Sequence, residues 1–108
     1  MNYTFIEINN KKHAIKFGFN ALRKYSSKTN TSLQDLDKLG ADMTLDNALT
    51  LIYCGIEDGY RAAKQEFKLT IDDLADLIDT DYEVIARAME ILTEQMGGGG
   101  EKKQKAKK

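Results

Sequence analysis

Cysteine and histidine are nearly absent from the sequence, which has one of each, Cys54 and His13. A single cysteine excludes an internal disulfide, and this favours a reducing compartment such as the cytoplasm. A Cys–His nucleophile pair needs its side chains within hydrogen-bond reach, but His13 falls in a predicted strand and Cys54 in a predicted apolar helix. We expect Cys54 to be a small buried hydrophobe and His13 to have no chemical role. The sequence therefore predicts no catalytic residue and no enzyme.

Long apolar runs are also missing. The longest runs, such as residues 51–54, span only a few residues, whereas a transmembrane helix needs about 20. The N-terminal residues lack the basic and apolar regions of a signal peptide, so we expect no leader and no membrane partner. The only run of glycines is at 97–100, which predicts no phosphate-binding loop, no cofactor and no small-molecule substrate. Proline is absent, which by itself excludes no fold class.

Charge is uneven along the chain, although the net charge is only −1 at neutral pH. Residues 101–108 hold five lysines and one glutamate, whereas residues 69–96 hold a single base, Arg87, and eight acids. Phosphate contacts dominate affinity for nucleic acids, so an acidic surface predicts no nucleic-acid partner. Four glycines are entropically costly to order, so we expect residues 97–108 to form a flexible, solubilising tail. The eight acids are Asp72, Asp73, Asp76, Asp79, Asp81, Glu83, Glu90 and Glu94.

Residues 3–17 have the pattern of a β-hairpin. Residues 3–8 are rich in β-branched and aromatic side chains, and residues 13–17 return as a second strand. Between them lies the sequence NNKK, residues 9–12, and asparagine tolerates the left-handed backbone conformation of tight turns. A lone hairpin is only marginally stable in water, so one of its faces must pack on the helices that follow.

The residues after Gly18 have helical spacing. Residues 19–25 predict a helix, residues 26–31 a polar loop, and Ser32 begins a short helix that Gly40 ends. Thr44 is a suitable N-cap for a longer helix with apolar residues at positions 45, 48, 49, 52 and 56. Other apolar side chains widen this stripe, which is typical of a central helix.

The second half of the chain contains two glycines and two helix starts. Gly55 and Gly59 indicate close packing or a kink, and residues 60–67 predict a further helical stretch. Thr70 and Thr80 are each followed three residues later by an acid, as in a capping box. We therefore predict helices over residues 70–78 and 81–96.

These patterns together predict an α+β fold in which helices dominate. We expect a single small domain over residues 1–96. Its hairpin occupies residues 3–17, and about four or five helices occupy residues 19–96.

The acids of the C-terminal helices invite comparison with a calcium loop. Asp79, Asp81, Glu83 and Glu90 fall at positions 1, 3, 5 and 12 of a window that resembles an EF-hand. The sixth position requires glycine but holds valine, and the ninth holds Arg87, which repels a cation. The same acids are suited to capping helix N-termini, so we predict no metal site.

A second motif resembles the attachment site of acyl carrier proteins. That family places a serine after Gly-Ala-Asp, but here Met43 follows Gly40-Ala41-Asp42, and Thr44 fits only with a one-residue insertion. Carrier proteins are also entirely helical, whereas this chain opens with a predicted hairpin. A carrier-type domain without its attachment serine is a remote alternative.

Three segments, taken in order, resemble the tail assembly chaperones of long-tailed bacteriophages and prophages. They are IKFGFNALRK at residues 15–24, LIYCGIEDG at residues 51–59 and FKLTIDDLADLID at residues 67–79. The hairpin precedes them and a final helix follows, so the resemblance spans about residues 3–96.

The resemblance implies a function in phage assembly. Such chaperones bind the long, apolar, helical tape measure protein in the bacterial host cytoplasm before the tail tube polymerises, and they help recruit tail tube protein. Many are also made as a longer product by ribosomal frameshifting, with which the Gly/Lys tail is compatible. The alternative is a virion structural protein, such as a tail or head-completion component, that stays in the finished particle.

A chaperone of this kind needs an apolar surface for its client. Leu51, Tyr53 and Tyr60 lie off the main apolar stripe of the central helix, and helix-in-groove recognition uses apolar anchors at helical spacing. Tyrosine suits such a site because it combines apolar area with a polar tip. We predict that these three residues contact an apolar helix of the partner, with self-association as a further possibility.

Overall fold

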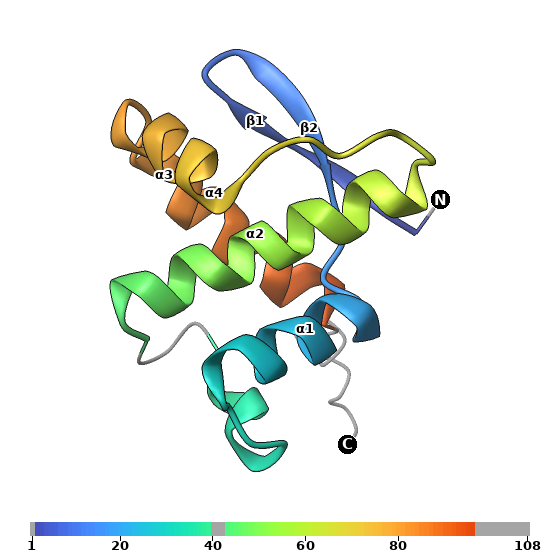
Figure 1. The fold of residues 1–108 in the computed structure, drawn as a ribbon, viewed down its shortest axis with the longest axis vertical. Helices are drawn as coiled ribbons and strands as arrows, with labels where there is room; N and C mark the ends of the chain where they lie inside the picture. Colours follow the sequence, from blue (N-terminus) through green and yellow to red (C-terminus); the bar gives the residue numbers. More distant parts are fainter. Residues whose placement is uncertain (1, 40–42, 97–108) are drawn as a thin grey trace.

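The computed structural model describes residues 2–39 and 43–96. The predicted flexible tail at 97–108 lies outside the described residues, as does Gly40, the predicted end of the short helix. The described chain has an N-terminal antiparallel hairpin followed by four α-helices and one short 3-10 helix (Figure 1). The predicted α+β, helix-dominated fold is therefore confirmed.

The hairpin pairs β1 (Thr4–Ile8) with β2 (Lys11–Ile15). Asn9 and Asn10 form the turn between them, with φ of 52° and 68°, the left-handed values that a two-residue turn requires. The second strand thus begins two residues earlier than predicted, because the turn consumes only two residues. Ile6, Ile8 and Ile15 are buried, so one face of the hairpin packs on the helices.

The first helix, α1 (Phe19–Thr29), is one turn longer than predicted. Residues 26–29 were expected to be in a loop, but they continue the helix. The Thr29 hydroxyl donates to the Tyr25 carbonyl at 2.8 Å, and the Ser26 hydroxyl donates to the Thr31 carbonyl just beyond the helix at 2.6 Å. The helix ends at Asn30, which has a left-handed φ of 58°. The 3-10 helix η1 (Gln34–Lys38) follows, and the Ser32 hydroxyl accepts from the Asp35 amide near its start.

The longest helix is α2 (Leu45–Ala62), and the predicted N-cap is confirmed, since the Thr44 hydroxyl accepts from the Asn47 amide at 3.1 Å. The helix ends at Ala62, so the predicted helical stretch over residues 60–67 is wrong beyond that point. Lys64 adopts a left-handed φ of 60°, which stops the helix, and the chain then returns along α2 in an irregular segment, residues 63–70 (Figure 1).

Two helices complete the domain, α3 (Ile71–Asp79) and α4 (Glu83–Gln95). A full capping box joins Thr70 and Asp73, as predicted. The second predicted cap is wrong: the Thr80 hydroxyl donates to the Leu77 carbonyl and so belongs to the end of α3, while α4 begins after Tyr82 without a side-chain cap.

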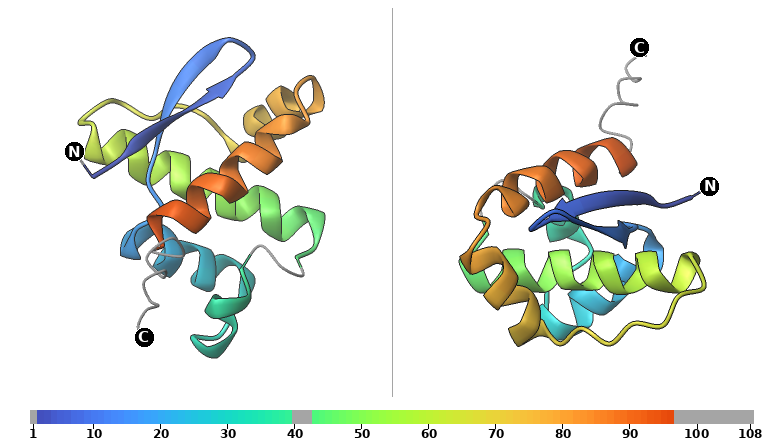
Figure 2. Two further views of the ribbon diagram at one scale, coloured as in Figure 1. Left: turned by 180° about the vertical axis from the view of Figure 1, so that it is seen from behind. Right: turned by 90° about the horizontal axis from the view of Figure 1, so that it is seen from above.

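The central position of α2 organises the fold. It packs on α1, on β2, and on α3 and α4, while α4 also lies against β1 (Figure 2). Gly55 and Gly59 permit the closest of these contacts, because an added Cβ at Gly55 would strike the Phe17 ring and one at Gly59 the backbone of β2. In the part of the chain that the structure describes, no helix has both the length and the apolarity to cross a membrane.

Candidate partner-binding groove

The three residues predicted to contact a partner, Leu51, Tyr53 and Tyr60, all make intramolecular contacts. Leu51 is fully buried in the hydrophobic core, at 0% exposure. The Tyr53 hydroxyl donates to the Leu69 carbonyl at 3.0 Å, and the Tyr60 hydroxyl lies 2.8 Å from Nδ1 of His13. A partner therefore has no access to Leu51 in this conformation, and both tyrosines have structural partners.

The two tyrosines hold the irregular segment 63–70 against α2. The Phe67 ring lies 5.4 Å from the ring of Tyr53 and 5.3 Å from that of Tyr60, distances typical of favourable aromatic packing. Burial raises the pKa of both phenols, so both remain neutral at physiological pH. This aromatic cluster explains how a segment without regular structure stays attached to the domain.

His13 and Cys54 are both buried. Cys54 is fully buried, and desolvation raises the pKa of its thiol to about 11, so the thiolate is negligible at neutral pH. His13 is 5% exposed and its pKa is lowered, mainly by burial and secondly by the charge of Lys11. Its Nδ1 is already engaged by Tyr60. The interaction with Tyr60 gives His13 a structural role that the sequence did not indicate.

Two acids of the calcium-like window, Asp81 and Glu83, pair with the same arginine. Asp81 pairs with Arg87 at 3.1 Å and accepts from the Asn9 amide, and these hydrogen bonds lower the pKa of its carboxyl. Glu83 pairs with the same arginine at 3.4 Å. Across residues 2–39 and 43–96, no three His, Cys, Asp or Glu side chains are grouped so that they could hold a metal ion.

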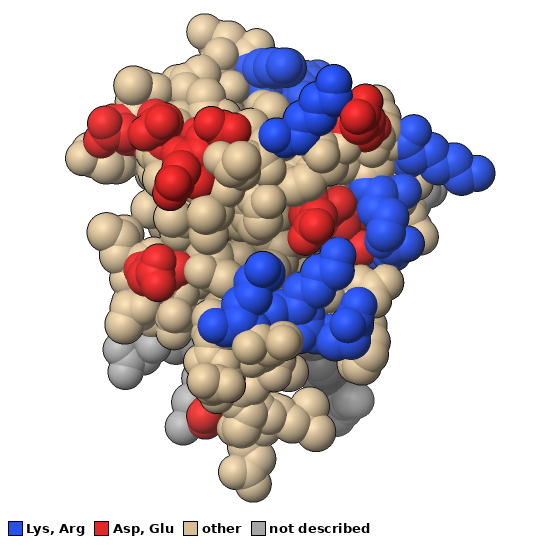
Figure 3. Space-filling view, viewed as in Figure 1, with Lys and Arg blue, Asp and Glu red and all other residues tan. Residues whose placement is uncertain are grey.

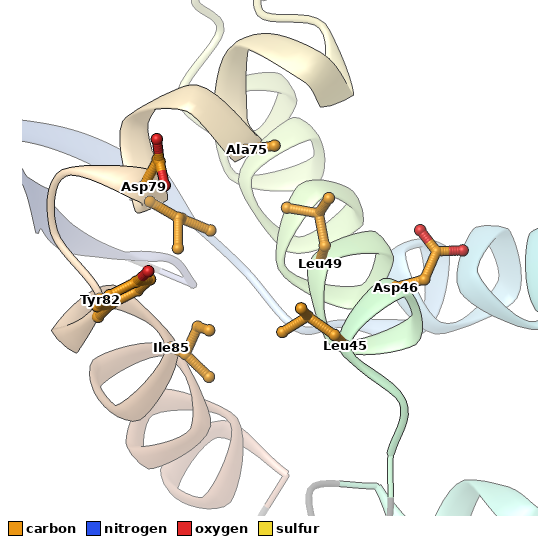
Figure 4. A pocket seen from close by; sticks show the side chains of 8 residues that line it. Leu45, Asp46, Leu49, Ala75, Asp79, Tyr82 and Ile85 are labelled. Atoms are coloured by element: carbon orange, nitrogen blue, oxygen red, sulfur yellow. The ribbon is translucent and has the colours of Figure 1, made fainter.

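An apolar groove opens where the N-terminal end of α2 faces the junction of α3 and α4 (Figure 4). It has a volume of about 510 Å³. Leu45 and Leu49 come from α2, and Tyr82 and Ile85 lie across from them at the start of α4 (Figure 4). The full lining is Leu45, Asp46, Leu49, Ala75, Ile78, Asp79, Tyr82 and Ile85. We call this site the α2–α3–α4 groove.

Two large side chains of the groove are strongly exposed. Leu45 is 77% exposed and Tyr82 is 73% exposed. Both stand at helix ends: Leu45 is the first residue of α2, and Tyr82 is the N-cap of α4. At these positions the helices extend past the core that covers their middle turns, so the side chains have no neighbour to bury them.

The charges around the groove are negative. Its only ionisable side chains other than Tyr82 are Asp46 on α2 and Asp79 on α3. Acidic side chains gather over α3 in the space-filling view, and basic side chains over α1, which carries Arg23, Lys24 and Lys28 (Figure 3). The groove thus belongs to the acidic side of the molecule.

Sequence reasoning missed this groove because Leu45 and Leu49 were assigned to the buried stripe of the central helix. Periodicity identifies the face of a helix but does not indicate how far along its length that face is covered. One signal was present: Leu45 directly follows the cap Thr44, so it occupies the first turn, where coverage commonly ends.

Comparison with known proteins identifies no relative: no family model, no curated protein and no solved structure matches this chain. The functional argument therefore depends on the geometry of the groove and on the order of elements along the chain.

Proposed function

We propose that this protein is a tail assembly chaperone of a long-tailed bacteriophage or prophage, and that it holds an apolar helical segment of the tape measure protein before the tail tube polymerises. The observation that carries the proposal is the α2–α3–α4 groove, with Leu45 and Tyr82 exposed at its edges. The segments at residues 15–24, 51–59 and 67–79, which resemble such chaperones, give the proposal its biological setting.

The shape of the groove favours a helix as the bound element. Leu45 and Leu49 are one turn apart on α2, and Tyr82 and Ile85 form a second apolar ridge at the start of α4. A helix of the partner can pack between these two ridges, with its side chains inserted among those of α2 and α4. Exposed leucine and tyrosine around an apolar hollow are also typical of protein-binding surfaces.

The chemistry of the groove favours binding over catalysis. Its lining is apolar apart from two carboxylates and one phenol, and neither His13 nor Cys54 contributes to it. A chaperone in the bacterial host cytoplasm needs such a surface to keep an apolar client soluble until tail tube subunits are recruited.

Capture of the client tests the proposal. The chain is co-expressed with the tape measure protein of the same genome, and the amount of soluble complex is measured by affinity capture. Leu45→Asp should abolish capture while leaving the thermal melt unchanged, because aspartate is compatible with the first turn of a helix. Leu33→Asp is the matched control, since Leu33 is 82% exposed but lies outside the groove lining.

Failure of the unmodified chain to keep the tape measure protein soluble would contradict the proposal. Mass spectrometry of purified particles separates it from the alternative of a virion structural protein. An assembly chaperone should be absent from finished particles, whereas a tail or head-completion component should be present in stoichiometric amounts.

A further inference from the structure

The α2–α3–α4 groove has two carboxylates in its lining, those of Asp46 and Asp79. Among the described residues, neither Asp46 nor Asp79 makes an ion pair. They stand on opposite sides of the groove, Asp46 on α2 and Asp79 on α3 (Figure 4). An apolar element bound between them would therefore have a negative charge along each of its flanks.

The position of Asp79 is unfavourable for the isolated domain. It is the last residue of α3, where the helix dipole already places partial negative charge, and the last turn of α3 has no basic residue. Asp46, in contrast, is in the first turn of α2, where the dipole favours an anion. The unfavourable placement of Asp79 is relieved when a cation approaches the end of α3 from outside.

The base nearest in sequence is already occupied. Arg87 donates to the Glu7 carbonyl at 2.8 Å and pairs with Asp81 at 3.1 Å and Glu83 at 3.4 Å. These contacts fasten α4 to β1 and to the α3–α4 turn, so Arg87 is not available to the groove. Among the described residues, Arg87 therefore does not serve Asp79, and an occupant of the groove could supply the missing cation.

We infer that the α2–α3–α4 groove selects an amphipathic helix of the partner whose apolar stripe is flanked on both sides by lysine or arginine. This inference depends on the proposed function and specifies the segment of the client that is bound. The basic residues on both flanks of the partner helix face Asp46 and Asp79, and this attraction fixes the register of the helix and speeds its association. The apolar stripe supplies most of the affinity.

Two other occupants fit less well. A second copy of the chain would bring the acidic residues 69–96, which include one arginine and eight acids, against the same kind of surface. Residues 101–108 of the chain itself carry the right charge but have alanine as their only apolar residue, which cannot fill an apolar groove of about 510 Å³.

Two synthetic helical peptides test the inference with the full-length protein. Both have the same leucine stripe, and the flanking positions are lysine in one and glutamine in the other. Binding is measured by fluorescence anisotropy at low and high salt. The lysine peptide should bind roughly tenfold more tightly at low ionic strength, since each exposed ion pair adds a few-fold to affinity. At about 0.5 M salt the difference should largely disappear.

Charge-neutral variants localise the effect. The Asp46→Asn, Asp79→Asn double variant should bind the two peptides equally well and should bind the glutamine peptide as the unmodified chain does. The Asp72→Asn, Asp76→Asn double variant also removes two negative charges, but from positions of α3 outside the groove lining. It should keep most of the preference for the lysine peptide.

Each other outcome has a definite meaning. Equal binding of the two peptides by the unmodified chain overturns the inference and leaves the proposed function standing, because capture of the tape measure protein is measured separately. Equal loss of preference in both double variants also overturns it, because the selectivity would then come from the general field of the acidic surface. Failure of both peptides to bind, with successful capture of the tape measure protein, would place the client elsewhere.

Discussion

The two halves of α2 differ in how the rest of the molecule covers them. In the C-terminal half, the apolar side chains of Cys54 and Ile56 are at 0% exposure. Gly59 lies against the backbone of β2, and the Gly55 carbonyl accepts a hydrogen bond from the Lys16 amide at 2.9 Å. This half is fixed by contacts between backbones, which leave no room for adjustment.

The first turn of α2, residues 45–49, lacks such enclosure. Leu45 is 77% exposed, Leu49 is half-buried, and both line the α2–α3–α4 groove. Asp46 beside them has no ion pair among the described residues. The contacts here are between side chains, and several positions are unfilled, so a partner's helix can enter without disturbing the core.

One end of α2 is thus held by the hairpin, and the other end is left open to the groove. Glycine serves the enclosed half, because it brings the hairpin close enough for the helix to be held rigidly. Leucine in the open first turn offers apolar area to the proposed partner. The location of the proposed binding surface is decided by where the neighbouring elements end, and less by the residues of α2 themselves.

The largest effect should follow substitution at the enclosed end. In an ordinary helix interior, Gly→Ala stabilises by roughly 0.5–1 kcal/mol. In Gly59→Ala the added methyl would lie 2.5 Å from the Ala14 carbonyl oxygen and closer still to the Ile15 amide. The hairpin must then move, and we expect a loss of about 3 kcal/mol in the free energy of unfolding, measured by urea denaturation.

Gly55→Ala is the graded control for this substitution. Its methyl would meet the Phe17 ring at 2.5 Å, and a side chain shifts more easily than a strand. We expect a smaller loss, of about 1 kcal/mol. A Gly59→Ala protein more stable than the unmodified chain would show that the hairpin does not hold α2 through its backbone.

The hairpin and helices were predictable from local chemistry. The pair Asn9-Asn10 specified a tight turn, and Thr44 and Thr70 specified two helix starts, because each signal acts within four residues of itself. The end of α2 was not predictable in this way. Residues 63–67 have helical spacing, but the aromatic contacts of Phe67 with Tyr53 and Tyr60 favour an extended return along the helix.

The groove could not be predicted from the sequence, because it depends on three helices at once. Tyr82 falls within the helix predicted over residues 81–96, yet it precedes α4 and is 73% exposed. Involvement of Tyr53 and Tyr60 in partner binding stays a prediction, and the contacts that they make give them a structural role. Both tyrosines lie off the main stripe of α2, and the segment that covers them, residues 63–70, follows in the chain and folds back along the helix.

An intermediate effect is expected at the N-cap of α3, the helix that forms one wall of the groove. The Thr70 hydroxyl accepts from the Asp73 amide at 3.0 Å, and the Asp73 carboxylate accepts from the Thr70 amide at 3.0 Å. Thr70→Ala should therefore lower the free energy of unfolding by about 1 kcal/mol. Thr93→Ala is the control, because Thr93 lies inside α4 without a capping role. This variant should change the free energy of unfolding by nearly zero.

A smaller effect, dependent on pH, should come from His13 at the enclosed end of α2. Its pKa in the folded protein is lowered from 6.5, chiefly by burial and then by Lys11, so the unfolded chain binds a proton more readily. Stability should then fall as the pH drops below about 6.5, and the contribution should be constant above it. Urea denaturation between pH 5 and 8 measures this slope, and His13→Gln should remove it. An unchanged slope in that variant would assign the pH dependence to another group.

The smallest effect on stability is expected at the open end of α2, and it is the sharpest test of how far along the helix its apolar stripe is covered. Leu45 and Ile52 belong to the same apolar stripe, two turns apart, but Leu45 is 77% exposed and Ile52 is fully buried. Alanine matches leucine in helix propensity, so Leu45→Ala should change the free energy of unfolding by less than about 0.5 kcal/mol. Ile52→Ala, which opens a cavity in the core, should cost about 2–5 kcal/mol.

Urea denaturation of both variants, with peptide binding measured in parallel, should show Leu45→Ala as stable but defective in binding. A loss of stability in Leu45→Ala comparable to that in Ile52→Ala would mean that the first turn of α2 is covered in solution, and the groove would then be part of the core.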